Sequence, residues 1–384
     1  MQKKLLSLAV ATAMAAPAAV LADATLYGKA HVSIDFVEQF SSLTATASDG
    51  TETTTTTSQE GWGLSNGGPY GKGNPRASRI GVKGSEKFGG SGLKAIYQIE
   101  FDVALTNERD YDLFDGDAGN KDQGSAIKMR NSYVGLQGGW GTFLIGRHDT
   151  PLKTSTSKLD LFNDRMADYQ GTLDFNDVRA DDTITYITPD FGGFQFAAAT
   201  IPGAGRLGNE NDNVNLGLAE AYSLAAIYKN GPWYGSAAYQ VVGDQLSAQQ
   251  TTRSTTPEDY ETLRVGLGIR DLGGFYLSGI YEKQENIDFN TTEENDADLW
   301  QVQAGYKFGK SMLKGMYGVK ELNLSDAKNA EKDKDKSSWA VGLDHSFTKR
   351  TTAYALYTAV DTDSDVDKDL GDWSGFSLGI IHNF

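Results

Sequence analysis

The strongest constraint on this chain is an alternation of apolar and polar residues with a period of two. Between residues 93 and 103 the apolar positions are Leu93, Ala95, Tyr97, Ile99, Phe101 and Val103, and the polar positions between them are Lys94, Gln98, Glu100 and Asp102. The final residues repeat the pattern, with Phe376, Leu378, Ile380 and Phe384 alternating with Ser377, Gly379 and Asn383. Side chains of a β-strand point alternately to opposite faces, so the pattern predicts strands with one apolar and one polar face.

Two kinds of break separate these segments and alternate along the chain. Seven breaks are short and turn-like, at 89–92, 138–139, 191–193, 230–232, 273–274, 309–310 and 349–350. Eight breaks are long, polar and mostly acidic, at 39–75, 107–125, 150–180, 203–217, 245–259, 286–297, 324–336 and 362–373. These breaks delimit sixteen predicted strands, and the short turns favour an antiparallel arrangement.

Sixteen antiparallel strands predict an all-β fold, a closed transmembrane β-barrel. An open sheet tends to curl or split beyond about ten strands, whereas closure pairs both edges and satisfies the backbone groups in a bilayer. A barrel of this size encloses water. The two kinds of break predict short periplasmic turns at one end and long extracellular loops at the other. A soluble β-sandwich or β-helix is the alternative, and the mean hydropathy of −0.42 fits either.

Composition removes several classes of function. The chain has no cysteine, which excludes a disulfide framework and thiol chemistry. Its 4 histidines are too far apart for a metal-ligand motif, so neither a metal nor another cofactor is expected. The net charge is −16 and the basic residues are dispersed, so no nucleic-acid partner is expected. We therefore do not expect an enzyme.

Residues 1–22 predict a cleaved secretory signal peptide. Lys3 and Lys4 precede an apolar stretch that ends at Ala22, a small residue of the kind found at cleavage sites. A membrane anchor is the alternative, but the stretch contains Pro17 and is barely long enough to cross a hydrocarbon core of about 30 Å. Residues 23–384 would then form the barrel, and without the two lysines the net charge changes from −16 to −18.

Four stretches resemble the Gram-negative general porins. They are TLYGKAHVSIDF (25–36), SRIGVKGSEKFGGSGLKAIYQIEFDV (78–103), RNSYVGLQGGWGTFLIGRHDTP (130–151) and DDTITYITPDFGGFQFAAA (181–199). The final His-x-Phe is similar to the signal that the barrel-assembly machinery reads, which makes Phe384 its candidate residue. The resemblance implies a homotrimer in the outer membrane, in contact with its lipid and lipopolysaccharide. Each barrel would have its own pore, narrowed midway by its third long loop.

Strand parity assigns a set of charged residues to the interior wall. Their neighbours turned to lipid are Ile80, Val82, Ile127, Met129 and Tyr133. The residues then expected to line the lumen are Arg79, Lys83, Lys94, Glu100, Lys128 and Arg130. The resemblance implies that Arg79 and Arg130, with Lys83 beside them, form the basic wall of the constriction. Arg147 matches a family arginine there, although its parity groups it with the lipid-facing residues, so a bulge or a strand end has to intervene.

Residues 150–180 are the predicted constriction loop, here called loop three. A loop of 31 residues is longer than a compact domain normally carries without a function. Its aspartates are Asp160, Asp164, Asp168, Asp174 and Asp177. Carboxylates opposite basic wall residues would create a transverse field that favours polar solutes over apolar ones. Asp160 and Asp164 are the first candidates for the acidic side, followed by Asp168.

The expected function is passive diffusion of small hydrophilic solutes and ions. Thr185 and Leu144 occupy positions where relatives often carry arginine, and together with the charge of −18 they suggest a weak cation preference. The acidic excess lies largely in predicted outer loops, where it could instead bridge divalent ions to lipopolysaccharide. A substrate-specific porin for a phosphate, a sugar or an organic acid is the alternative. An outer-membrane enzyme or adhesin is a remote one.

Overall fold

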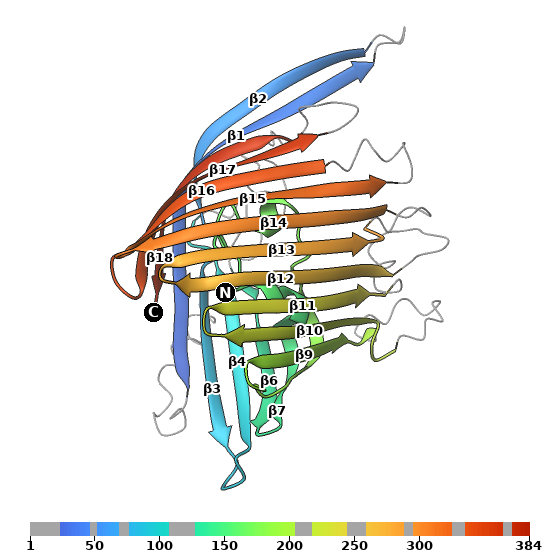
Figure 1. Cartoon of the computed structure of the whole chain (residues 1–384), viewed down its shortest axis with the longest axis vertical. Helices are drawn as coiled ribbons and strands as arrows, with labels where there is room; N and C mark the ends of the chain where they lie inside the picture. The colour runs from blue at the N-terminus through green and yellow to red at the C-terminus, as the bar shows by residue number, and fades with distance from the viewer. Residues whose placement is uncertain are drawn as a thin grey trace, which may run out of the picture.

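The computed structural model describes residues 24–46, 52–68, 77–106, 127–203, 217–243, 259–287, 295–324, 335–363 and 371–384. They form one antiparallel sheet that closes on itself, because strand β1 (Thr25–Thr46) pairs with the last strand, β18 (Trp373–Asn383). In Figure 1 strands β9 to β17 form the near wall, with β3, β4, β6 and β7 crossing beyond them. The predicted signal peptide lies outside the described residues.

The remaining strands follow one another around the barrel in chain order. They are β2 (Glu52–Ser65), β3 (Arg79–Lys87), β4 (Lys94–Val103), β5 (Ile127–Met129), β6 (Ser132–Gly138), β7 (Gly141–Asp149), β8 (Arg179–Ile187), β9 (Phe194–Ile201), β10 (Ala221–Asn230), β11 (Trp233–Val242), β12 (Tyr260–Leu272), β13 (Phe275–Glu285), β14 (Asn295–Phe308), β15 (Ser311–Leu324), β16 (Asp335–Ser346) and β17 (Thr351–Asp363).

Eighteen strands occupy sixteen positions around the barrel. β2 and β3 share one position, because both pair with β1 at different heights. β5 and β6 share another, because both pair with β4. The prediction of a closed barrel of sixteen antiparallel strands is therefore confirmed.

The short turns lie at the same end of the barrel as the start of β1 and the end of β18. Strands β3–β4, β6–β7, β8–β9, β10–β11, β12–β13, β14–β15 and β16–β17 are joined there at the predicted short breaks. Gly274 illustrates why these turns need glycine. Its φ is 89°, and a Cβ atom at this position would lie 2.7 Å from the carbonyl oxygen of Lys307 on the next hairpin.

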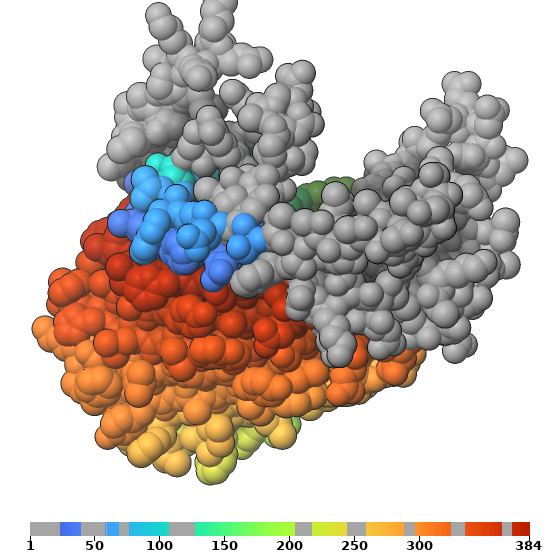
Figure 2. Space-filling view, turned by 90° about the horizontal axis from the view of Figure 1, so that it is seen from above, coloured from blue at the N-terminus to red at the C-terminus, as the bar shows by residue number. Residues whose placement is uncertain are grey.

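The first predicted long break is wrong in part. Residues 39–75 were expected to be a loop, but β1 continues to Thr46 and β2 runs back from Glu52 to Ser65, paired with it throughout. The five threonines Thr53–Thr57 are β-branched, and this favours the extended backbone of a strand. The hairpin of β1 and β2 projects past its neighbours in Figure 1. It lies beside the C-terminal strands in both views (Figures 1 and 2).

The two faces of the wall differ as the alternation predicts. Ile80, Val82 and Ile99 are exposed on the outside, whereas Glu100 is 6% exposed on the inside. Apolar outer residues meet lipid in such a barrel, and the polar inner residues meet water or one another. Among the residues that the structure describes, no helix is long and apolar enough to cross a membrane.

A β-bulge between β5 and β6 changes the phase of the side chains at the wall position that these two strands share. Phe101 lies opposite Met129 and Gln98 lies opposite Tyr133, so four residues on this side match three on β4. Met129 faces outward as predicted, but Tyr133 faces inward, where its hydroxyl contacts Gln98. The prediction for Tyr133 was wrong because one extra residue in a strand reverses every later side chain.

Candidate functional site

Loop three occupies residues 150–178, between the end of β7 and the start of β8. Its ends are held together by a hydrogen bond from the backbone N–H of Thr150 to the carbonyl oxygen of Val178, at 3.1 Å. Helix α2 (Pro151–Thr156) is N-capped by Thr150, and helix α3 (Tyr169–Thr172) is N-capped by Asp168. The caps satisfy backbone donors that would otherwise be unpaired inside the barrel.

Apolar side chains pack loop three onto the inner wall along its length. The buried ones are Leu152, Leu159, Phe162, Met166, Tyr169, Leu173 and Phe175. Their partners on the wall include Ala225, Ala238, Tyr234, Ile280, Leu299, Met316, Leu356 and Trp373. Burial of one such side chain stabilises the packed state by about 1.5–3 kcal/mol, so loop three is held as firmly as part of a soluble core.

Ion pairs reinforce this packing on the β12–β16 side. Lys314 of β15 donates to the carbonyl oxygen of Leu161 at 2.6 Å and pairs with Asp344 of β16 at 3.1 Å. Arg165 of loop three pairs with the same carboxylate at 2.9 Å. Asp174 pairs with Lys320 and Lys336, and Asp177 pairs with the fully buried Arg264.

The tip of loop three reaches the basic wall through Asp164. Its carboxylate is 2.7 Å from Nζ of Lys29 on β1 and 2.8 Å from Nη2 of Arg79 on β3. Burial alone would raise the pKa of Asp164, but the two cations hold it well below its usual range. Asp164 is therefore ionised at neutral pH.

Asp160 and Asp168 do not contact the wall cations Lys29 and Arg79. Asp160 accepts hydrogen bonds from the backbone N–H of Phe162 and from the side-chain amide of Gln303. Burial raises its pKa to about 6. Asp168 accepts from the N–H groups of Asp164 and Gln170, and burial beside Asp160 raises its pKa well above the usual range.

A second group of ion pairs continues the basic wall from β4 to β8. Arg130 contacts Glu100 and Asp102, each at 2.7 Å. Asp149 contacts Arg179 at 3.0 Å and Lys153 at 3.6 Å. Together with the pairs at the tip, five cations face four carboxylates. The carboxylates are Glu100, Asp102, Asp149 and Asp164, and the cations are Lys29, Arg79, Arg130, Lys153 and Arg179. We call these nine residues the wall cluster.

The other predicted wall residues lie at different places. Lys83 lies over the ring of Tyr27, 5.1 Å from its centre, on the interior face. Lys94 pairs in register with Gln137 on β6, near the turns, and Lys128 with Asp102. Thr185 lies opposite Leu144, and both are buried on the inner face.

Arg147 lies at a second bulge. Between Gly146 and His148 the register with β8 shifts by one residue, and Arg147 forms an ion pair with Asp181. Asp181 is largely exposed and does not belong to loop three. A bulge is therefore present at Arg147, as its strand parity required. The partner of Arg147, however, is a residue outside the wall cluster.

Three wall-cluster cations were missed from sequence, and so was the buried Arg264. Lys29 shares strand parity with Tyr27, whose hydroxyl donates to Glu100 inside the barrel, so alternation along β1 could have found it. Lys153 lies in helix α2 of loop three and Arg179 at the start of β8, and no strand alternation in the sequence assigns a face to either. The sequence does not distinguish Arg264 from other lumen-facing arginines, because its contacts depend on the path of loop three.

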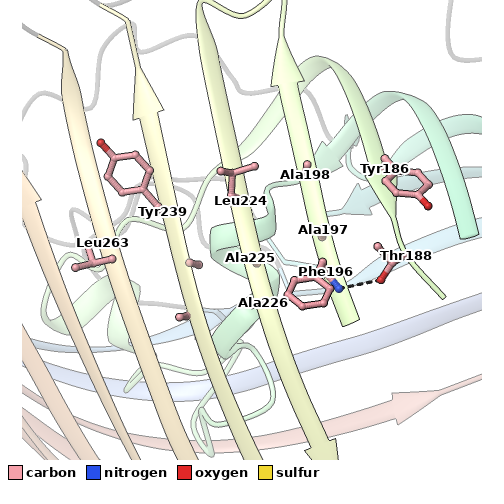
Figure 3. A pocket seen from close by; sticks show the side chains of 12 residues that line it. Tyr186, Thr188, Phe196, Ala197, Ala198, Leu224, Ala225, Ala226, Tyr239 and Leu263 are labelled. Carbon is pink, nitrogen blue, oxygen red and sulfur yellow. Dashed lines mark hydrogen bonds between the residues drawn. The ribbon is translucent and has the colours of Figure 1, made fainter. Parts of the chain in front are cut away.

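A shallow depression on the outer face does not belong to this site. Figure 3 shows Tyr186, Phe196, Leu224, Tyr239 and Leu263 around a floor of alanines on β9 to β11. Phe196 and Leu224 are among the exposed outward-facing residues, on the side of the wall opposite loop three. Such a surface is typical of a wall that meets lipid.

A closed barrel with an apolar exterior, a charged interior and a long inserted loop defines the class of outer-membrane β-barrel channels. A family model described as Gram-negative porin matches residues 6–365. This chain therefore belongs to the Gram-negative porin family. It is an outer-membrane channel for the passive diffusion of small hydrophilic solutes.

Curated relatives and solved structures agree with this assignment. The chain is 28% identical over 364 residues to the major outer membrane protein P.IB of Neisseria meningitidis serogroup B, covering 92% of this chain and 91% of the relative. The protein of that name from Neisseria sicca is 26% identical over 372 residues, covering 92% of each. The anion-selective porin from Comamonas acidovorans has a similar fold, with a TM-score of 0.65, 21% identity and coverage of 94% of this chain and 99% of that one.

Proposed function

We propose that solutes cross the barrel between loop three and the wall formed by β1 to β8, past the wall cluster. The packing of loop three onto β10 to β18 supports this path, because that half of the interior is filled by side chains. Asp164 would form the acidic edge of the constriction, and Arg79 and Arg130 its basic edge. Asp160 and Asp168 would hold the shape of the loop.

The wall cluster favours weak ion selectivity. Each carboxylate of the wall cluster contacts at least one cation. The electric field is therefore strong between the two groups of an ion pair and falls off rapidly with distance from the pair. Five cations opposite four carboxylates carry almost no net charge. The proposed weak cation preference would therefore have to come from acidic residues outside the wall cluster, whose charges act on an ion over about 8 Å at physiological salt.

Reversal potentials in planar bilayers under a salt gradient test this proposal. Asp164→Asn removes one negative charge and should shift the potential toward anions, whereas Arg79→Gln should shift it toward cations. Arg147→Gln is the matched control, because its partner Asp181 lies outside the wall cluster. Unchanged potentials in both Asp164→Asn and Arg79→Gln would contradict the proposed path. A shift for Arg147→Gln as large as that for Arg79→Gln would place Arg147 at the constriction.

The biological setting that we propose follows the family. The protein would be a homotrimer, with its short turns in the periplasm and its loops near lipopolysaccharide. It would be exported through cleavage after Ala22 and assembled by recognition of Phe384. It would act by diffusion without a catalytic step. Light scattering of the purified protein in detergent would measure the oligomer, and N-terminal sequencing should begin at Asp23.

A further inference from the structure

A fully buried ion pair lies beneath loop three. Arg264, on the inner face of β12, and Glu282, on β13, are each 0% exposed. Its Nη1 atom donates to Asp177 Oδ1 at 2.7 Å and to Thr156 Oγ1 at 3.1 Å, and its Nε atom donates to Glu282 of β13. The guanidinium lies over the rings of Tyr169 and Phe175, 5.6 and 5.5 Å from their centres.

These contacts join both arms of loop three to the wall. Thr156 ends the outgoing helix α2, whereas Tyr169, Phe175 and Asp177 belong to the returning arm. Glu282 completes the junction, because its second oxygen accepts the backbone N–H of Asn176 at 2.8 Å. A planar guanidinium with several fixed donors can make all of these contacts at once, which a lysine cannot.

The other anchors of loop three are simpler. Lys314 contacts the carbonyl oxygen of Leu161 and the neighbouring ring of Phe162, and Lys320 and Lys336 contact one carboxylate, Asp174. Arg264, by contrast, contacts side chains from both arms, with Thr156 on the outgoing arm and Asp177 on the returning arm. Removal of its charged loop partner, Asp177, should therefore loosen the arms relative to each other as well as to β12.

We propose that Arg264, together with Asp177, is the positioning element of loop three and thereby fixes the cross-section of the channel. Arg264 is fully buried and the side chain of Asp177 is only 5% exposed, so the pair acts on conductance through the position of the loop and does not act on ion preference. This inference rests on the proposed function only in that loop three bounds the solute path.

Asp177→Asn is the most direct test, because it removes the loop carboxylate that binds Arg264 and leaves the Arg264–Glu282 pair intact in the wall. We expect single-channel recordings to lose the sharp wild-type conductance level, with a broader distribution of levels and closures at lower voltage. The reversal potential should stay at its wild-type value. Asp181→Asn is the matched control, since it is the same change at a paired carboxylate outside loop three, and it should leave both readouts unchanged.

A reversible crosslink separates positioning from a general loss of structure. A Cβ atom at Gly266 of β12 would lie 2.8 Å from Cγ2 of Thr156, within reach of a disulfide, and the chain has no cysteine of its own. In the Asp177→Asn background, Thr156→Cys with Gly266→Cys should give a sharp conductance level when oxidised and a broad distribution when reduced. The same molecules are thus their own folding control.

Two outcomes would overturn the inference. One is an Asp177→Asn channel with wild-type conductance, noise and closing voltage. The other is a broadened distribution that oxidation of the cysteine pair leaves unchanged, although mass spectrometry shows the disulfide. Failure of the proposed selectivity path would show itself differently, as unchanged reversal potentials in the variants of Asp164 and Arg79.

Discussion

At the scale of the residue, the aspartates of loop three have different tasks despite their similar spacing. Asp164 meets the cations of β1 and β3, Asp160 meets Gln303 of β14, and Asp168 caps a helix. The sequence could identify loop three and its acidic character. It could not distinguish these carboxylates, because each orientation depends on a wall residue more than a hundred positions away or on a helix of four residues.

Asp160 should make loop three more stable in mild acid. Its pKa is about 6 in the folded loop and about 4 when the loop is open, so the closed form binds a proton more tightly. The closed loop should gain stability as the pH falls from about 7 to about 4. Asp164 acts in the opposite direction, since the stability from its lowered pKa is lost only in stronger acid.

Hydrogen exchange of the Phe162 amide measures this effect. After correction for the intrinsic rate, protection at pH 5 should exceed protection at pH 7. Asp160→Asn should remove much of the difference, leaving the part that comes from Asp168. Equal protection of the wild type at both pH values would contradict the expectation, as would a pH dependence that the variant leaves unaltered.

At the scale of the element, single extra residues in the wall decide which side chains reach the interior. Alternation correctly assigned Ile80, Val82 and Met129, but it failed for Tyr133 beyond the bulge. A bulge follows from the pairing of two strands, and one strand's residue pattern does not reveal it. The extension of β1 and β2 was missed for the same reason. The residues of this hairpin have the composition of a polar loop, and they form strands because they pair with each other.

Loop three should respond to core substitutions as a packed element does. Phe162 is 0% exposed, and Nζ of Lys314 lies 4.6 Å from the centre of its ring. Phe162→Ala should create a cavity and lower the free energy of loop opening by about 3–5 kcal/mol. Hydrogen exchange of the loop amides should report this loss, accompanied by noisier open-channel current.

The matched control for this substitution is Phe308→Ala. Phe308 is 48% exposed on the outer face, at the turn end of β14, and has no contact with loop three. Its replacement should leave loop exchange unchanged. Equal effects of the two substitutions would show that loop three is not held by its buried side chains.

At the scale of the whole molecule, closure depends on the first and last strands of the chain. Gly28 and Phe384 exchange two backbone hydrogen bonds of 3.0 Å, next to the pairing of β1 with β18. The ring of Phe384 covers Gly28 so closely that a Cβ atom there would lie 2.2 Å from it. Strand number and closure were predictable, because sixteen alternating segments have few other solutions.

Phe384→Ala should separate assembly in the cell from folding in detergent. The backbone bonds to Gly28 survive the substitution, so refolding of the purified chain into detergent should give a closed barrel. If Phe384 is read by the assembly machinery, the amount of barrel in the outer membrane should fall severalfold. Phe347→Ala is the control, at an exposed aromatic residue near another turn. Equal amounts of both variants in the outer membrane would argue against the signal.

The packing of loop three has a consequence for the order in which this protein forms. The loop precedes in the chain most of the strands that hold it, from Ser223 of β10 to Asp344 of β16, and its tip needs Lys29 from the opposite end. Its apolar side chains therefore have no surface to cover until the cylinder has been completed around them. In an unfinished barrel, loop three should be exposed and sensitive to protease. Protection of loop three from the protease would then mark the last step of maturation.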